Sequence, residues 1–116
     1  RALIEAGEDV INTTRDNGVT ALYVGAQNGR ETVVRALFEL GADINEARDL
    51  GATPLFIGAF QGNEAVVRAL IEVGADVNKA NDIGGSPLSA STTPISNVAR
   101  GNHAAIVQLL RDAGAV

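Results

Sequence analysis

The sequence lacks several residue types on which common sites and folds depend. It has no cysteine in 116 residues, which excludes disulfide bonds, thiolate metal sites and cysteine nucleophiles. Its single histidine excludes a metal site built from several histidines. Aromatic residues make up only 3% of the chain, whereas glycine occurs 13 times, a composition typical of small, regularly punctuated helices. We therefore expect one domain of close-packed helices that holds no metal and no cofactor.

Positive charge and long apolar runs are also scarce. Nine lysines and arginines stand against 14 acidic residues, so the net charge is -5. Binding to duplex nucleic acid or to an anionic membrane surface requires clustered positive charge, so we expect neither. No stretch approaches the ~18 apolar residues of a membrane-spanning helix, and residues 1–7 do not resemble a secretory signal. These features predict a soluble intracellular protein of the cytoplasm or the nucleus.

The chain repeats itself with a period of 33 residues. Residues 16–48 and 49–81 align without a gap and are identical at 19 of 33 positions. Residues 1–15 match the end of this unit, and residues 82–116 form an altered unit. Self-similarity at a fixed period of this length is typical of proteins built from stacked structural repeats. We therefore expect one domain with a partial repeat, two complete repeats and a modified terminal repeat.

Each unit is predicted to form two short helices followed by an extended finger. Thr53 followed by Pro54 marks a helix start, because threonine caps the first amides and proline fits the first helical position. Gly62 and Gly74 are predicted to end the first and the second helix, as their counterparts do in the preceding unit. Helices this short are marginal alone in water, so they must bury their apolar faces against neighbouring units.

Four motifs recur within the 33-residue period. They are Gly-x-Thr-Pro-Leu at 51–55, Ala-x-x-Gly at 59–62, Val-Val-x-x-Leu at 66–70 and Gly-Ala-Asp-Val-Asn at 74–78. Together they closely resemble ankyrin repeats, and the resemblance covers essentially the whole chain. It implies an all-α solenoid of stacked helix–turn–helix repeats from which short β-hairpin fingers project.

The sequence departs from the ankyrin pattern at two positions of the first helix. Tyr23 and Phe56 stand where the family usually has histidine, so the buried hydrogen bond of that histidine is lost or changed. Gly25 and Gly58 replace the usual alanine. A glycine inside a helix costs up to ~1 kcal/mol relative to alanine, so these glycines indicate a close approach between stacked helices.

The last unit contains seven additional residues. A step of 33 from the helix start at residues 53–54 leads to Ser-Pro at 86–87, and a step of 40 leads to Thr-Pro at 93–94. One helix across both starts is disfavoured, because the second proline would lie in its interior. We predict a loop over residues 86–92, with room for one helical turn, and a helix that restarts near residue 93. The insertion is interpreted first as a harmless addition and second as a partner-specific loop.

The sequence displays no arrangement of residues suited to catalysis or metal binding. His103 is the only histidine, and it lies in a segment that matches the repeat, so we expect it to be structural. Residues 84–86 lack the pattern of a phosphate-binding loop. Asp16, Asp49 and Asp82 recur every 33 residues and so lie on separate fingers, whereas calcium needs converging oxygen ligands. We expect these aspartates to form hydrogen bonds within turns instead.

The expected function is recognition of a protein partner on a concave surface of finger tips and first helices. In ankyrin repeats the variable contact positions lie at those places, and they can be carried over position by position. The finger-tip positions are Asp16, Asn17, Val19, Asp49, Leu50, Ala52, Asp82 and Ile83. The first-helix positions are Tyr23, Gln27, Asn28, Phe56, Phe60 and Gln61. The acidic fingers predict a partner with basic patches that is steered by charge.

Three of these positions are apolar where polar residues would be accepted, namely Leu50, Phe60 and Ile83. Clustered exposed apolar groups usually mark an interface, and a few of them carry most of its binding energy. The alternative, given equal weight, is that Leu50 and Ile83 pack on each other along the fingers.

Other functions stay open. The chain can be a structural or regulatory spacer within a larger multidomain enzyme, which a further domain in the full-length protein would favour. It can also be a substrate for modification, because Asn45 and Asn78 follow Leu37 and Leu70 by eight residues and resemble sites of asparaginyl hydroxylases in ankyrin repeats. The same asparagines have structural reasons to recur. We also expect the sequence to be a piece of a longer repeat array or part of a larger protein.

Overall fold

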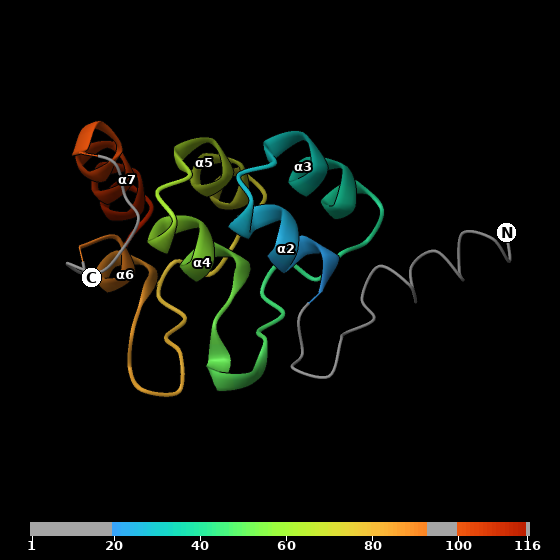
Figure 1. Ribbon diagram of the computed structural model, residues 1–116, viewed down its shortest axis with the longest axis horizontal. Coiled ribbons are helices and arrows are strands. Elements are labelled where there is room, and N and C mark those ends of the chain that lie inside the picture. Colours follow the sequence, from blue (N-terminus) through green and yellow to red (C-terminus); the bar gives the residue numbers. More distant parts are fainter. Residues whose placement is uncertain (1–19, 93–99, 116) are drawn as a thin grey trace, which may run out of the picture.

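The structure, a computed structural model, describes residues 20–92 and 100–115, and its helices lie in two rows (Figure 1). The first row holds α2 (Ala21–Gln27), α4 (Pro54–Phe60) and α6 (Pro87–Thr92). The second row holds α3 (Glu31–Glu39), α5 (Glu64–Glu72) and α7 (Arg100–Asp112). Each helix packs against its partner in the other row and against the next helix in its own row. Among the described residues, none of the helices has the length and apolar character needed to cross a membrane.

The predicted helix starts of the two complete repeats are confirmed. The hydroxyl of Thr20 accepts a hydrogen bond from the amide of Tyr23 at 3.2 Å. The hydroxyl of Thr53 accepts one from the amide of Phe56 at 3.1 Å, and Pro54 occupies the first helical position. Each threonine therefore satisfies an amide that has no partner within its own helix.

The predicted glycine stops are confirmed as well. Gly29, Gly41, Gly62 and Gly74 have positive φ values of 72°, 102°, 76° and 97°. After each glycine the next amide donates to the carbonyl five residues earlier; the example in α5 is the bond from Ala75 to Leu70 at 2.9 Å. This is the usual way in which a left-handed glycine closes a helix.

The core is one cluster of buried apolar side chains that extends across all three helix pairs. Leu22, Leu55, Leu70 and Leu110 are each at most 1% exposed and come from α2, α4, α5 and α7. Because every repeat contributes to this cluster, each helix pair buries its apolar face by stacking on its neighbours.

Polar side chains also join neighbouring repeats. The amide nitrogen of Asn63 donates to the carbonyl oxygens of Ala26 and Gln27 at 2.9 and 3.2 Å. The amide oxygen of Asn45 accepts a hydrogen bond from the backbone amide of Asp76 at 2.9 Å. Asn63 thus satisfies carbonyls at the end of α2, which a helix leaves without partners.

The close approach expected at Gly25 and Gly58 occurs within one helix pair and not between stacked pairs. A Cβ atom added at Gly58 would lie 3.1 Å from a methyl carbon of Val66. At Gly25 the nearest atoms, on Val33 and Val34, would be 3.5 Å away. The expectation was therefore wrong about which helices meet, and the contact is tighter in the second complete repeat.

The fingers do not form the expected β-hairpins, because the described residues contain no strand. At the tip of each described finger one amide donates across the turn, from Arg48 to Ala52 at 2.9 Å and from Asn81 to Gly85 at 2.7 Å. A bond of this kind closes a turn, whereas a strand pair needs a continued ladder. The short 3-10 helix η1 (Asp49–Gly51) forms the tip of the first of these fingers.

The first helix of the last repeat starts earlier than predicted. α6 covers the segment expected to be a loop, so that expectation is wrong. The cause is local, because Ser86 and Ser89 cap each other. The Ser86 hydroxyl accepts from the Ser89 amide at 3.2 Å, and the Ser89 hydroxyl accepts from the Ser86 amide at 2.8 Å. The predicted restart near residue 93 lies outside the described residues.

Candidate protein-binding surface

The predicted contact residues in the described part of the chain lie on the finger tips and the first helices. The exposed ones are Gln27, Asn28, Asp49, Leu50, Asp82 and Ile83, and the partly exposed ones are Ala52, Phe56, Phe60 and Gln61. We call the surface formed by residues 48–52, residues 81–85 and the accessible sides of α2, α4 and α6 the finger–helix surface. The predicted contacts Asp16, Asn17 and Val19 lie outside the described residues.

Tyr23 is the exception among the predicted contacts, because its side chain is only 4% exposed. The guanidinium of Arg48 lies over the ring, 5.3 Å from its centre, and forms an ion pair with Asp49 at 3.1 Å. The hydroxyl of Tyr23 and then the carboxylate of Asp49 raise the pKa of Arg48 above its ordinary value. Tyr23 therefore supports a finger from below, and its ring is not available as a contact.

Leu50 and Ile83 stand in solvent at the tips of neighbouring fingers. They are 72% and 91% exposed, so the alternative in which they bury each other is wrong. Leu50 also has a φ of 69°, in the left-handed region that leucine rarely adopts. An exposed apolar residue in a strained conformation is a reason to look for function at this tip.

The aspartates of the finger tips do not hold the turns as expected. The Asp49 carboxylate bonds the side chain of Arg48, and in the second finger Asn81 takes the structural role. The amide oxygen of Asn81 accepts from the amides of Ile83 and Gly85 at 3.1 and 2.7 Å. The carboxylate of Asp82 forms no ion pair within the described part of the chain.

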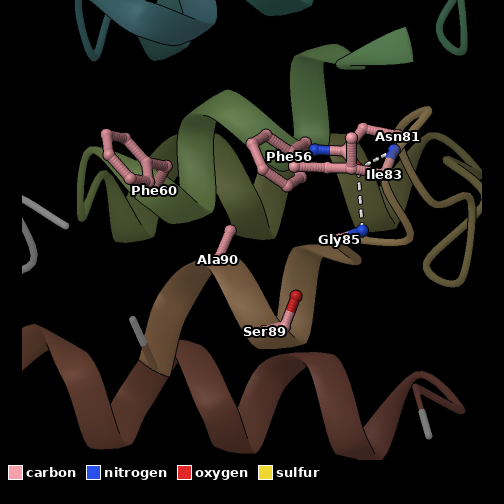
Figure 2. Close-up of a pocket in the computed structure, with 7 residues that line it drawn as sticks. All are labelled: Phe56, Phe60, Asn81, Ile83, Gly85, Ser89 and Ala90. Carbon is pink, nitrogen blue, oxygen red and sulfur yellow. Dashed lines mark hydrogen bonds between the residues drawn. The ribbon is translucent and has the colours of Figure 1, made fainter. Parts of the chain in front are cut away.

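A pocket of about 290 Å³ opens between α4, α6 and the second finger (Figure 2). Its lining residues are Phe56 and Phe60 of α4, Asn81, Ile83 and Gly85 of the finger, and Ser89 and Ala90 of α6. The two phenylalanine rings stand along one side, and Ala90 points toward them from α6 (Figure 2). Apolar walls with a few polar groups at the edge are typical of pockets that bind an apolar group.

The family model for ankyrin repeats, described as three copies of the repeat, matches residues 1–81. The chain belongs to the ankyrin repeat family. Ankyrin repeats are generally protein–protein interaction modules, and ankyrin repeat domains are typically non-catalytic. The match ends before α6, so the pocket lies at the border between the matched repeats and the altered last unit. No curated protein matches this ankyrin repeat chain.

Four of the pocket residues were not among the predicted contacts, namely Asn81, Gly85, Ser89 and Ala90. The ankyrin pattern places contacts at finger tips and first helices in general, and it does not indicate where a pocket forms. A comparison of the last repeat with the one before it could have found them, because bulkier residues stand at the same four positions there.

The repeat asparagines take part in hydrogen bonds that hold the ankyrin units together. Besides the bond from Asp76 to Asn45, the side-chain amide of Asn78 donates to the carbonyl of Gly114 at 3.1 Å. Both asparagine amides also accept the bond of a tight turn, with Asp43 and Asp76 as acceptors at 3.0 Å. Their recurrence therefore has a structural reason. Across residues 20–92 and 100–115, no group of three potential metal ligands is found.

Proposed function

We propose that this ankyrin repeat chain binds a protein partner on the finger–helix surface and catalyses no reaction. The observation that carries the proposal is the exposure of Leu50 and Ile83, 72% and 91%, at adjacent finger tips. The two tips are joined by a hydrogen bond from the amide of Asp82 to the carbonyl of Leu50 at 2.9 Å. Large apolar side chains held in solvent at fixed positions gain free energy when a partner covers them.

The first-helix row supports the same proposal through its lack of charge. Helices α2, α4 and α6 contain no aspartate, glutamate, lysine or arginine. Charged residues are depleted at the centres of protein interfaces because they are costly to remove from water. The stacking of three helix pairs also supports a solenoid in which adjacent repeats extend one continuous surface.

The fingers supply the charge of the proposed interface. Residues 43–49 and 76–82 contain five carboxylates and two cationic side chains. The carboxylates belong to Asp43, Glu46, Asp49, Asp76 and Asp82, and the cations to Arg48 and Lys79. This excess of negative charge supports a partner with basic patches, because complementary charge speeds association and excludes acidic competitors.

The test removes one finger-tip contact without touching the core. Partners captured from cells by the wild-type chain are identified, purified and titrated against wild type and Leu50→Asp. We expect Kd to rise about 30-fold, the equivalent of ~2 kcal/mol, with the melting temperature almost unchanged because Leu50 is exposed.

The matched control is Leu40→Asp, which changes a 58% exposed leucine at the end of α3, away from the fingers. It should leave Kd as in wild type. A partner whose Kd shifts equally in both variants, or in neither, would contradict the proposed surface.

A further inference from the structure

The pocket between α4 and α6 forms where the last repeat has smaller side chains than the repeat before it. A step of 33 residues replaces Arg48 by Asn81, Ala52 by Gly85, Phe56 by Ser89 and Ile57 by Ala90. All four of the smaller residues line the pocket. The space is therefore a property of this chain's own sequence, because loss of side-chain volume at matched positions of a regular stack leaves room unfilled.

The pocket has a firm interior and an open mouth. Ala90 is 3% exposed and lies on the α6 side, while Phe56 and Phe60 are half-buried on α4. Ile83, at 91% exposure, stands on the finger beside the opening (Figure 2). A volume of about 290 Å³ is at the lower limit of small-molecule pockets, so it suits one bulky side chain better than a whole ligand.

The edge of the pocket carries a negative charge that is not neutralised. Asp82 directly precedes Ile83 and is exposed, and no cationic group within the described ranges pairs with it. Asp49 on the neighbouring finger is paired with Arg48 at 3.1 Å, so it is partly compensated. Lys79 lies on the same finger as Asp82 without forming an ion pair in the described part. An incoming group beside Ile83 therefore meets an apolar wall and a free carboxylate together.

We propose that the α4–α6 pocket binds one bulky apolar side chain of the partner, from a segment that also carries lysine or arginine within a few residues. The apolar side chain fills the space between the Phe56 and Phe60 rings and Ala90, and the basic group approaches Asp82. The inference rests on the proposed function, since it names the part of a protein partner that the finger–helix surface selects. Anchoring by one buried side chain with a charged neighbour is a common source of specificity in protein interfaces.

A random peptide library displayed on phage provides a probe of defined chemistry. Peptides selected on the immobilised wild-type chain are synthesised and titrated by fluorescence polarisation against purified variants. We expect enriched sequences to combine leucine, isoleucine, methionine or an aromatic residue with lysine or arginine within about four positions. Asp82→Asn should weaken these peptides about threefold or more, and the weakening should disappear at high salt.

Two variants fill the pocket with residues that the repeat already tolerates. Ser89→Phe copies Phe56 and Ala90→Ile copies Ile57, so either should fold, which a melting curve verifies. Each should weaken the selected peptides at least tenfold. Ala65→Phe adds the same ring at an exposed position of α5 and should have no effect.

The remaining outcomes separate this inference from the proposed function. Peptides that lose affinity with Leu50→Asp but keep it with both filled variants overturn the pocket and leave the finger–helix surface standing. A selection that enriches no sequence, or sequences without an apolar anchor, also overturns the pocket. Concentration-dependent dimerisation of the wild type that Ser89→Phe abolishes would show that a second copy of the chain occupies the pocket instead.

Discussion

Gly25 and Gly58 occupy the same position in neighbouring repeats but should respond differently to alanine. Gly25→Ala should raise the free energy of unfolding by up to ~1 kcal/mol, because the added methyl group would meet Val33 and Val34 at an ordinary 3.5 Å. Gly58→Ala should gain nothing or destabilise, because Val66 lies 3.1 Å away and is fully buried. Urea denaturation measures both, and equal gains would contradict the tighter contact at Gly58.

Leu50 should show opposite effects on stability and on binding. Its φ of 69° lies in the left-handed region, which costs a residue with a Cβ atom ~1–2 kcal/mol, whereas asparagine tolerates it. Leu50→Asn should therefore raise the free energy of unfolding by ~1 kcal/mol while weakening partner binding tenfold or more. Thermal melts and a binding titration of the same preparation test this. A loss of stability would show that the leucine conformation is not strained.

At the residue scale, the sequence predicts side chains that act on their own backbone and misses those that depend on a neighbour. The caps of Thr20 and Thr53 follow from local rules, and so do the glycine stops. The left-handed Leu50 has no sequence signal, because leucine is a poor choice for that conformation. Tyr23 was expected on the surface because the pattern gives its position and not the Arg48 side chain that covers it.

Helices α3 and α5 have closely similar sequences but should differ in their sensitivity to truncation. Leu70 of α5 is 0% exposed between its neighbours, whereas Leu37 at the same position of α3 is only partly buried. Leu70→Ala should lower the free energy of unfolding by ~2–5 kcal/mol through the cavity that it leaves. Leu37→Ala should cost clearly less. Both are measured by chemical denaturation, and equal losses would mean that position in the repeat, and not burial, sets the cost.

At the element scale, the repeat predicts helices well where it is regular and fails where residues have been added. Both complete repeats have their helices at the expected starts and stops. In the last repeat two Ser/Thr-Pro starts compete, and the reciprocal cap of Ser86 and Ser89 favours the first one. Sequence spacing alone could not weigh that cap against the second start, so the helix α6 was expected as a loop. The fingers lack strands for a related reason, since the repeat fixes their turn residues and not the length of a ladder.

At the scale of the whole molecule, repetition makes the fold predictable and leaves the binding surface less so. A helix pair that cannot bury its apolar face alone must stack, and a 33-residue period indicates how often. The pocket, in contrast, depends on a difference between two repeats, Phe56 against Ser89 and Ile57 against Ala90. Features shared by all repeats specify the architecture, whereas the departures of one repeat from the next create the site.

The charge of the molecule leads to a last prediction, on the ionic strength dependence of partner binding. The net charge is -5, and the finger tips carry more carboxylates than cations. Salt screens such exposed charges, so raising NaCl from about 50 to about 500 mM should weaken binding several-fold, mainly through slower association. Asp82→Asn should flatten this dependence. Asp112→Asn, which removes the same charge from the end of α7, should not. Surface plasmon resonance gives both rate constants, and an association rate that is flat across ionic strength would show that the fingers do not steer the partner by charge.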